Sequence, residues 1–200
     1  MALPIVAVVG RPNVGKSTFV NRIAEADEAI VHEMRGVTRD RSYHKADWTG
    51  IEFKLIDTGG IEMGPEDQFQ CSIRSQAFEA TNEAYVIVFI VDGKTGINAD
   101  DEEVARILRK TSKPVLLAVN KLDTPNKLDE LWEFYQLGLG DPFPISATHG
   151  HGTGDLLDEV VDHLRKVDCS FEDEEDEEDI INVAIIGSPN AGKSSLTNRL

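Results

Sequence analysis

The stretch that most constrains the fold begins at Gly10 and has the pattern G-x-x-x-x-G-K-S. It follows a short apolar run at residues 5–9 and precedes residues 16–24, whose apolar side chains share one helical face. This order predicts a buried strand, a tight loop and a helix. Glycines let backbone N–H groups approach a polyphosphate, and a helix N-terminus adds partial positive charge. The residues expected to bind phosphate are Gly10, Arg11, Pro12, Asn13, Val14, Gly15, Lys16 and Ser17.

Two side chains of this loop have expected roles in nucleotide chemistry. The ammonium of Lys16 can reach the β- and γ-phosphates, and the hydroxyl of Ser17 can bind Mg²⁺. The alternative is an ordinary glycine-rich turn. The strand before the loop and the helix after it favour a phosphate-binding loop.

Composition limits the classes of partner and compartment. The chain has 200 residues, 40% of them hydrophobic, and a net charge of −16 from 20 Lys+Arg and 36 Asp+Glu. This balance argues against direct nucleic-acid binding by this segment, which would need clustered basic residues. The two cysteines are far apart in the sequence, and the N-terminus resembles neither a signal peptide nor a membrane anchor. We therefore expect a cytoplasmic protein without a membrane contact.

Alternating apolar runs predict an α/β fold, the three-layer sandwich of P-loop nucleotide-binding proteins, with a mostly parallel six-stranded sheet and one antiparallel hairpin strand. The expected strands are residues 5–9, 43–48, 51–56, 85–91, 114–119 and 143–145. The expected helices are residues 16–24, 70–83, a segment from Asp100, residues 128–137, and a last helix with a stripe of Leu156, Leu157, Val160, Val161 and Leu164. Residues 25–42 are expected to form a loop.

The opening of the chain repeats near its end. Residues 6–23 and 183–200 are identical at ten of eighteen paired positions. We therefore expect a first domain at residues 1–165, an acidic linker at 166–179 and the truncated start of a second domain at 180–200. The second loop, expected to bind nucleotide likewise, is Gly187, Ser188, Pro189, Asn190, Ala191, Gly192, Lys193 and Ser194.

A second motif, N-K-x-D, indicates guanine as the base. A carboxylate at Asp123 can accept from both N1–H and the 2-amino group of guanine, whereas adenine offers neither donor. The backbone N–H of the Ser146–Ala147 loop can meet guanine O6. The alternative for N-K-x-D is a helix cap. The motif consists of Asn120, expected to brace the loops, Lys121, expected to lie along the base, Leu122 and Asp123.

Residues on the γ-phosphate side complete the expected site. Asp57 follows a strand and can hold Mg²⁺, Thr38 can supply a second hydroxyl to Mg²⁺, and Gly60 can offer its N–H to the γ-phosphate. The loops around Thr38 and after Gly60 would be ordered by the γ-phosphate and Mg²⁺ and released on hydrolysis. The segment expected to line the nucleotide here is Asp57, Thr58, Gly59, Gly60 and Ile61.

Together these motifs resemble GTPases of the TRAFAC class and, more closely, the Der (EngA) family of tandem GTPases in bacterial ribosome assembly. The repeated phosphate loop is the most specific feature. The resemblance implies binding of GTP and GDP with Mg²⁺, GTP hydrolysis, and a whole protein with two G domains and a KH-like domain. It also implies that the large ribosomal subunit is the partner, contacted mainly through parts that this sequence lacks.

The residue after Gly60 raises the question of mechanism. Many GTPases place a glutamine there to orient the attacking water, but this chain has Ile61. Related GTPases bind K⁺ through an asparagine at the position of Asn13, so the resemblance implies a K⁺ site that assists hydrolysis. The alternative is that Asn13 only stabilises the turn. The expected catalytic residues are Lys16, Asn13, Thr38 and Gly60; the expected metal ligands are Ser17, Thr38, Asp57 and Asn13.

Three alternatives remain open at this level. A tRNA-modification GTPase shares the asparagine, but the repeated loop argues against it. A slow binding module would suit Ile61. The G domain of an iron transporter would need membrane helices downstream, whereas a second phosphate loop follows. His149 and His151 are expected to belong to a glycine-rich turn rather than a metal pair, and Trp48 and Trp132 to be packing residues.

Overall fold

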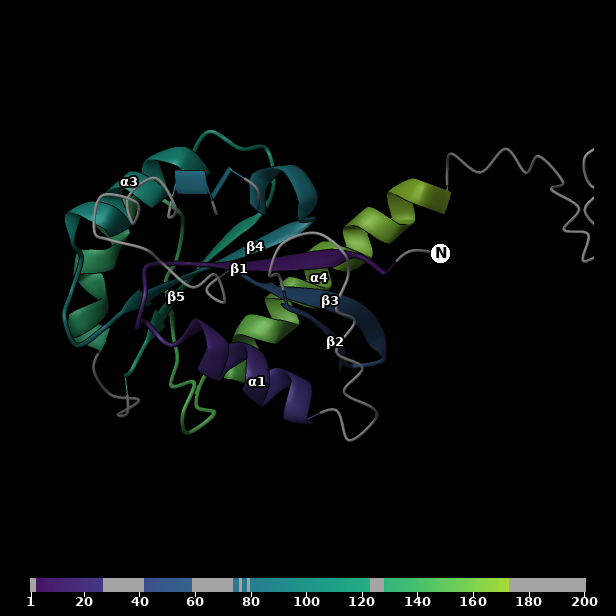
Figure 1. The fold of residues 1–200 in the computed structure, drawn as a ribbon, viewed down its shortest axis with the longest axis horizontal. Helices are drawn as coiled ribbons and strands as arrows, with labels where there is room; N and C mark the ends of the chain where they lie inside the picture. The colour runs from purple at the N-terminus through teal and green to yellow at the C-terminus, as the bar shows by residue number, and fades with distance from the viewer. Residues whose placement is uncertain are drawn as a thin grey trace, which may run out of the picture.

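The computed structural model describes residues 3–26, 42–58, 74–75, 77–78, 80–122 and 128–172. Along the chain these form β1 (Ile5–Val9), α1 (Lys16–Ala26), β2 (Ser42–Trp48), β3 (Ile51–Asp57), β4 (Val86–Asp92), α3 (Ala99–Leu108), β5 (Val115–Asn120), the 3₁₀ helix η1 (Leu128–Leu137), β6 (Phe143–Pro144) and α4 (Thr153–Glu172) (Figure 1). The described residues among 74–83 are also helical, as expected.

The six strands form one sheet in the order β2-β3-β1-β4-β5-β6. Every neighbouring pair is parallel except β2 and β3, which are antiparallel. The predicted turn joins these two strands at Thr49 and Gly50, whose φ angles are 51° and 82°. Positive φ at both turn residues matches the twist of a tight hairpin. The predicted fold class is therefore confirmed.

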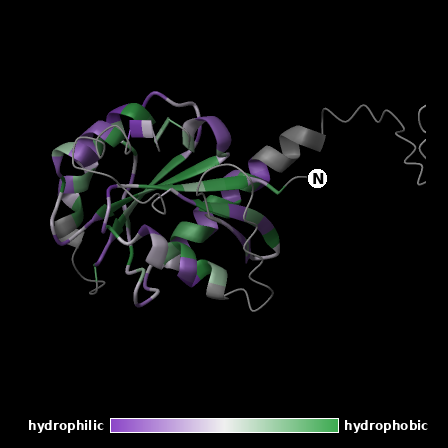
Figure 2. Ribbon diagram, in the orientation of Figure 1, coloured by the Kyte–Doolittle hydropathy of each residue, from purple (hydrophilic) through white to green (hydrophobic). Residues whose placement is uncertain are grey.

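Helices cover both faces of the sheet, and each face has its own apolar core (Figure 1). Residues of β1 alternate between them: Val6 and Val8 pack with α1 and α4, whereas Ala7 and Val9 pack with α3 and η1. The predicted stripe of α4 is buried throughout. Figure 2 shows hydrophobic strands at the centre and hydrophilic residues on the helices around them. This arrangement fixes the carboxyl ends of the parallel strands along one edge.

Two local expectations differ from the structure. Helix α4 continues to Glu172 and so includes residues 166–172 of the expected linker; no glycine or proline interrupts it after Gly154, and it ends at the first residue of the acidic run. Trp48 packs against the core as expected, but Trp132 is 70% exposed, so its expected packing role is wrong. Residues 173–200, with the rest of the linker and the second loop, lie outside the described residues.

Candidate nucleotide-binding site

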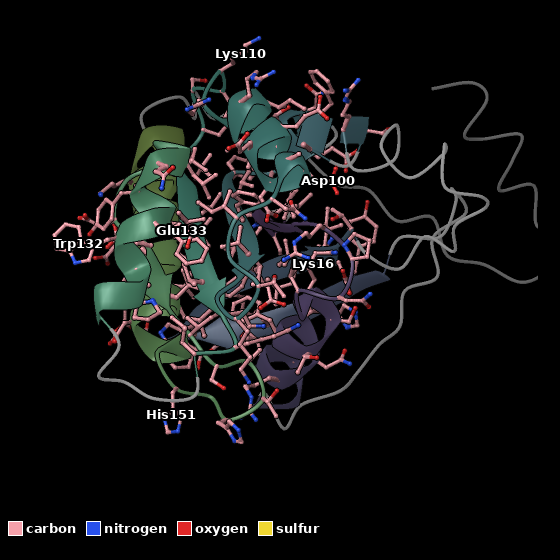
Figure 3. All side chains as sticks on the ribbon, turned by 90° about the vertical axis from the view of Figure 1, so that its left-hand side faces the viewer. Lys16, Asp100, Lys110, Trp132, Glu133 and His151 are labelled. Atoms are coloured by element: carbon pink, nitrogen blue, oxygen red, sulfur yellow. The ribbon has the colours of Figure 1, made fainter. Side chains whose placement is uncertain are left out.

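The four motifs follow the ends of four strands, β1, β3, β5 and β6, at one edge of the sheet. Lys16 lies between Asp100, at the start of α3, and the turn that contains His151 (Figure 3). The carboxyl edge of such a sheet is where α/β proteins bind ligands. Here it holds a pocket of about 650 Å³ lined by Pro12, Asn13, Gly15, Lys16, Ser17, Thr18, Lys94, Asn120, Lys121, Thr148 and His149.

Two glycines of the phosphate loop have no room for a side chain. A Cβ at Gly10 would lie 2.3 Å from the carbonyl oxygen of Ile90, and one at Gly15 would lie 2.4 Å from Nδ2 of Asn120. Their φ angles, 155° and 98°, are also unfavourable for other residues. Gly15, the second glycine of the motif, is therefore required by its contact with Asn120 of the N-K-x-D motif as well as by backbone geometry.

Lys16 is buried beneath its own loop. Its Nζ donates to the carbonyl oxygens of Gly10 at 2.8 Å and Arg11 at 2.9 Å. Burial lowers the pKa of Lys16, and the nearby carboxylate of Asp57 opposes that shift. The loop backbone thus holds the ammonium at the pocket, and the two carbonyls use two of its three N–H donors, so that the third could donate to a phosphate oxygen.

Asn120 joins the phosphate loop to the Ser146–Ala147 loop. Its Nδ2 donates to the carbonyl oxygen of Val14 at 2.7 Å, and its Oδ1 accepts from the backbone N–H of Ala147 at 2.9 Å. The residue is only 3% exposed. The structure therefore places Asn120 in the bracing position that the sequence suggested, with both ends of its amide used.

Lys121 forms the next contact along the same flank. Its Nζ donates to the carbonyl oxygen of Asn13 and to Oδ2 of Asp92, each at 2.7 Å. Burial raises the pKa of Asp92, but hydrogen bonds from Lys121 and from the N–H groups of Lys94 and Thr95 outweigh burial and lower it overall. Sequence reasoning missed Asp92, although an aspartate that ends a buried apolar strand was a usable signal.

Arg11 ties the phosphate loop to Thr95 and to the start of α3. Its Nε donates to Oδ2 of Asp101 at 3.2 Å, and its Nη2 donates to Oγ1 of Thr95. Asp101 forms a capping box with Asn98 at the start of α3. Burial raises the pKa of Asp101, and the charge of Arg11 offsets part of that shift. Sequence reasoning missed this pair as well; the capping pattern at residues 98–101 was its only signal.

The donors near Lys16 suit a hard divalent cation. Ser17 is exposed in the first turn of α1, and the carboxylate of Asp57 ends β3 close enough to influence Lys16. Hydroxyl and carboxylate oxygens are the ligands that Mg²⁺ prefers. Thr58 has a different task, since its hydroxyl donates to the carbonyl oxygen of Val8 at 2.7 Å. The other residues expected on the γ-phosphate side lie outside the described residues: Thr38, Gly59, Gly60 and Ile61. Asp123 of the N-K-x-D motif also lies outside them.

The turn after β6 is built by its backbone. The N–H of Ser146 donates to the carbonyl oxygen of His151 at 2.9 Å, and Arg22 donates to the carbonyl oxygens of Ala147 and Thr148. The rings of His149 and His151 are 6.2 Å apart. No group of three or more metal-ligating side chains occurs among the described residues.

Comparison with known proteins shows the family to which the chain belongs. The family described as 50S ribosome-binding GTPase matches residues 5–121. GTPase Der of Bacillus cytotoxicus is 54% identical over the whole chain, and GTPase Der of Leuconostoc mesenteroides is 55% identical over the whole chain. The chain spans 45% and 44% of these two relatives. A structure of Era with MgGDPNP and part of 16S ribosomal RNA has a TM-score of 0.63 and 28% identity, covering 82% of this chain and 57% of that one. With its phosphate loop and N-K-x-D segment joined at one sheet edge, the chain belongs to the family of 50S ribosome-binding GTPases.

Proposed function

We propose that this domain binds GTP and GDP with Mg²⁺, hydrolyses GTP, and acts as a switch in assembly of the large ribosomal subunit in the cytoplasm. The observation that carries the proposal is the amide of Asn120, which joins the phosphate loop to the loop expected to read guanine. Nucleotide placement then depends on both loops together. The family match and the resemblance to GTPase Der support the same assignment.

The chain's own residues suggest how each part of the nucleotide would be held. Backbone N–H groups of the phosphate loop and the ammonium of Lys16 would bind the phosphates, while Asp123 and the N–H of Ala147 would read guanine. Ser17 and Asp57, with Thr38, would hold Mg²⁺, which neutralises phosphate charge. Gly60 would donate to the γ-phosphate while water attacks in line with the leaving oxygen.

The proposed K⁺ dependence rests on Asn13, and the structure gives this residue a second explanation. Asn13 has a φ of 64°, in the left-handed region that asparagine tolerates better than most residues. Its carbonyl oxygen faces Lys121 in this conformation. Replacement by alanine would strain the backbone as well as remove the amide, whereas glycine would remove only the amide.

The test is therefore GTP hydrolysis in KCl and in NaCl at equal ionic strength, with Asn13→Gly and Asn13→Ala compared. We expect K⁺ to stimulate the wild-type protein by at least about tenfold, equivalent to ~1.4 kcal/mol of barrier. Asn13→Gly should bind GDP normally and lose the stimulation. Equal rates in both salts would contradict a K⁺ mechanism; if those rates were also negligible, a slow nucleotide-dependent binding module would be the better description.

The proposed ribosomal contact involves mainly parts of the whole protein outside this segment. The net charge of −16 makes this segment a poor match for the RNA backbone, so the contact would be made mainly by other parts of the whole protein. The described residues include no helix long and apolar enough to cross a membrane. Cosedimentation of the full-length protein with large subunits, in GDP and in a GTP analogue, tests the partner; equal recovery in both states would contradict a switch.

A further inference from the structure

We propose that Arg11 and Asp101 form a positioning pair, through which the N-terminus of α3 sets the conformation of the phosphate loop and hence the affinity for nucleotide. The pair ties the phosphate loop to the start of α3, and Asp101 is not among the residues expected to bind nucleotide. This inference rests on the proposed nucleotide binding and assigns a role to a helix cap and a loop side chain that the motif alone leaves unexplained.

The first step is that Arg11 is anchored to the protein. Its side chain is 17% exposed and makes two contacts with the segment that follows β4: one with Asp101 and one with Thr95. A long basic side chain in a phosphate loop could instead extend toward solvent or phosphate. Here its guanidinium fork is occupied by a carboxylate and a hydroxyl, and an arginine held in this way positions its own backbone.

The second step links that backbone to the phosphate-binding ammonium. The carbonyl oxygen of Arg11 accepts from Nζ of Lys16 at 2.9 Å, beside the bond from Lys16 to Gly10. A shift of Arg11 would therefore change one of the two backbone acceptors that hold Lys16. The path from α3 to Lys16 runs through one side chain and one carbonyl.

The third step is that Asp101 has few other ways to satisfy its charge. Its side chain is fully buried, and Oδ2 accepts from both Arg11 and the N–H of Asn98. Its Oδ1 has no hydrogen-bond partner within the part of the chain that the structure describes. Removing the cation from such a carboxylate is strongly unfavourable, which makes Arg11 hard to displace from this position.

A double-mutant cycle on GDP affinity tests the pair. The variants are Arg11→Gln, Asp101→Asn and their combination, measured by calorimetric titration with GDP and Mg²⁺ well below the unfolding temperature. Arg165→Gln, Asp162→Asn and their combination form the matched control, because Arg165 and Asp162 pair at 3.4 Å on the surface of α4. Arg11→Lys provides a folded, charged variant if Arg11→Gln does not fold.

We expect Arg11→Gln to weaken GDP binding about tenfold, in the range of remote positioning effects. Asp101→Asn should weaken it less, and the double variant should bind at least as well as Arg11→Gln, because the buried charge is gone. Arg11→Lys should recover part of the affinity, and the control cycle should stay within twofold. The proposal would be overturned if the fold-losses of GDP affinity in the two single variants multiplied in the double variant. It would also be overturned if the variants were less stable but bound GDP with unchanged affinity. If the wild-type protein did not bind GDP, the proposed function would fail first.

Discussion

Two ion pairs tie the phosphate loop to the end of β4 and the start of α3, one through Lys121 of the N-K-x-D motif (the guanine flank) and one through Asp101 of α3 (the α3 flank). They differ in how many hydrogen bonds the carboxylate accepts. On the guanine flank, Asp92 accepts from Lys121 and from two backbone N–H groups, and its pKa is lowered. On the α3 flank, Asp101 is buried with Oδ1 unpartnered within the described residues, and its pKa is raised. The comparison shows that a cationic neighbour does not by itself set a carboxylate's pKa; the balance of burial and hydrogen bonds does.

The two flanks also differ in what their residues face. Asn120 and Lys121 contact the phosphate loop and belong to the motif proposed to bind guanine. The guanidinium of Arg11 is bound by Thr95 and Asp101, and Asp101 is not among the residues expected to bind nucleotide. We therefore expect changes on the guanine flank to remove ligand contacts and loop support together, and changes on the α3 flank to act on the loop alone.

The largest expected effect comes from Asn120→Ala on the guanine flank. The change leaves the carbonyl of Val14 and the N–H of Ala147 without their partner. Two lost buried hydrogen bonds should lower the free energy of unfolding by about 2–4 kcal/mol. GDP affinity should fall by at least about a hundredfold, equivalent to ~2.7 kcal/mol. Urea unfolding and calorimetry measure both, with exposed Asn82→Ala as the control; unchanged GDP affinity would refute the bracing role.

A smaller effect on GDP binding is expected from Lys121→Met, and a still smaller one from Asp92→Asn. Methionine removes both hydrogen bonds of Lys121. Asparagine at 92 has a single acceptor oxygen, which can keep the two backbone bonds or the bond from Lys121, and it leaves the bond from Lys121 to Asn13 intact. GDP dissociation should accelerate about tenfold in the first variant and no more than about threefold in the second. Stopped-flow release of a fluorescent GDP derivative measures both rates. A larger effect from Asp92→Asn would show that the carboxylate, rather than the lysine, sets this flank.

The smallest expected effect is on the pH dependence of folding stability, to which Asp92 and Asp101 should contribute with opposite signs. The pKa of Asp92 lies below its ordinary value of 3.8, so its ionisation stabilises the fold above pH 3.8, and this contribution is lost as pH falls through the folded-state pKa. The pKa of Asp101 lies above 3.8, so its contribution is greatest below pH 3.8 and is lost as pH rises through the folded-state pKa.

Unfolding free energies across the acid range, wild type minus variant, measure this contrast. With rising pH the difference should increase for Asp92→Asn and decrease for Asp101→Asn. Slopes of the same sign would contradict the comparison of the two flanks. Glu52→Gln, which removes a carboxylate from the exposed pair with Lys45, serves as the control. Its difference in unfolding free energy from the wild type should change little with pH.

The sequence predicted the features that follow from periodicity and motif. Apolar runs located the strands, the hairpin turn at Thr49 and Gly50 was recognisable, and the stripe of α4 identified its buried face. Asp92 and Asp101 were missed because their roles depend on which segments the fold brings beside the phosphate loop, which local patterns do not encode. Trp132 was misjudged because an aromatic residue in an apolar segment can still face solvent.

Calorimetric titration of the protein with GDP and with ADP, at one Mg²⁺ concentration, decides whether the joined loops form a guanine nucleotide site. We expect GDP to bind at least about a thousandfold more tightly than ADP, because adenine would leave a polar recognition group unpaired. In Asp123→Asn, preference should move from GDP toward XDP. Equal affinity of the wild-type protein for GDP and ADP would contradict the assignment, and so would unchanged GDP affinity in Asp123→Asn.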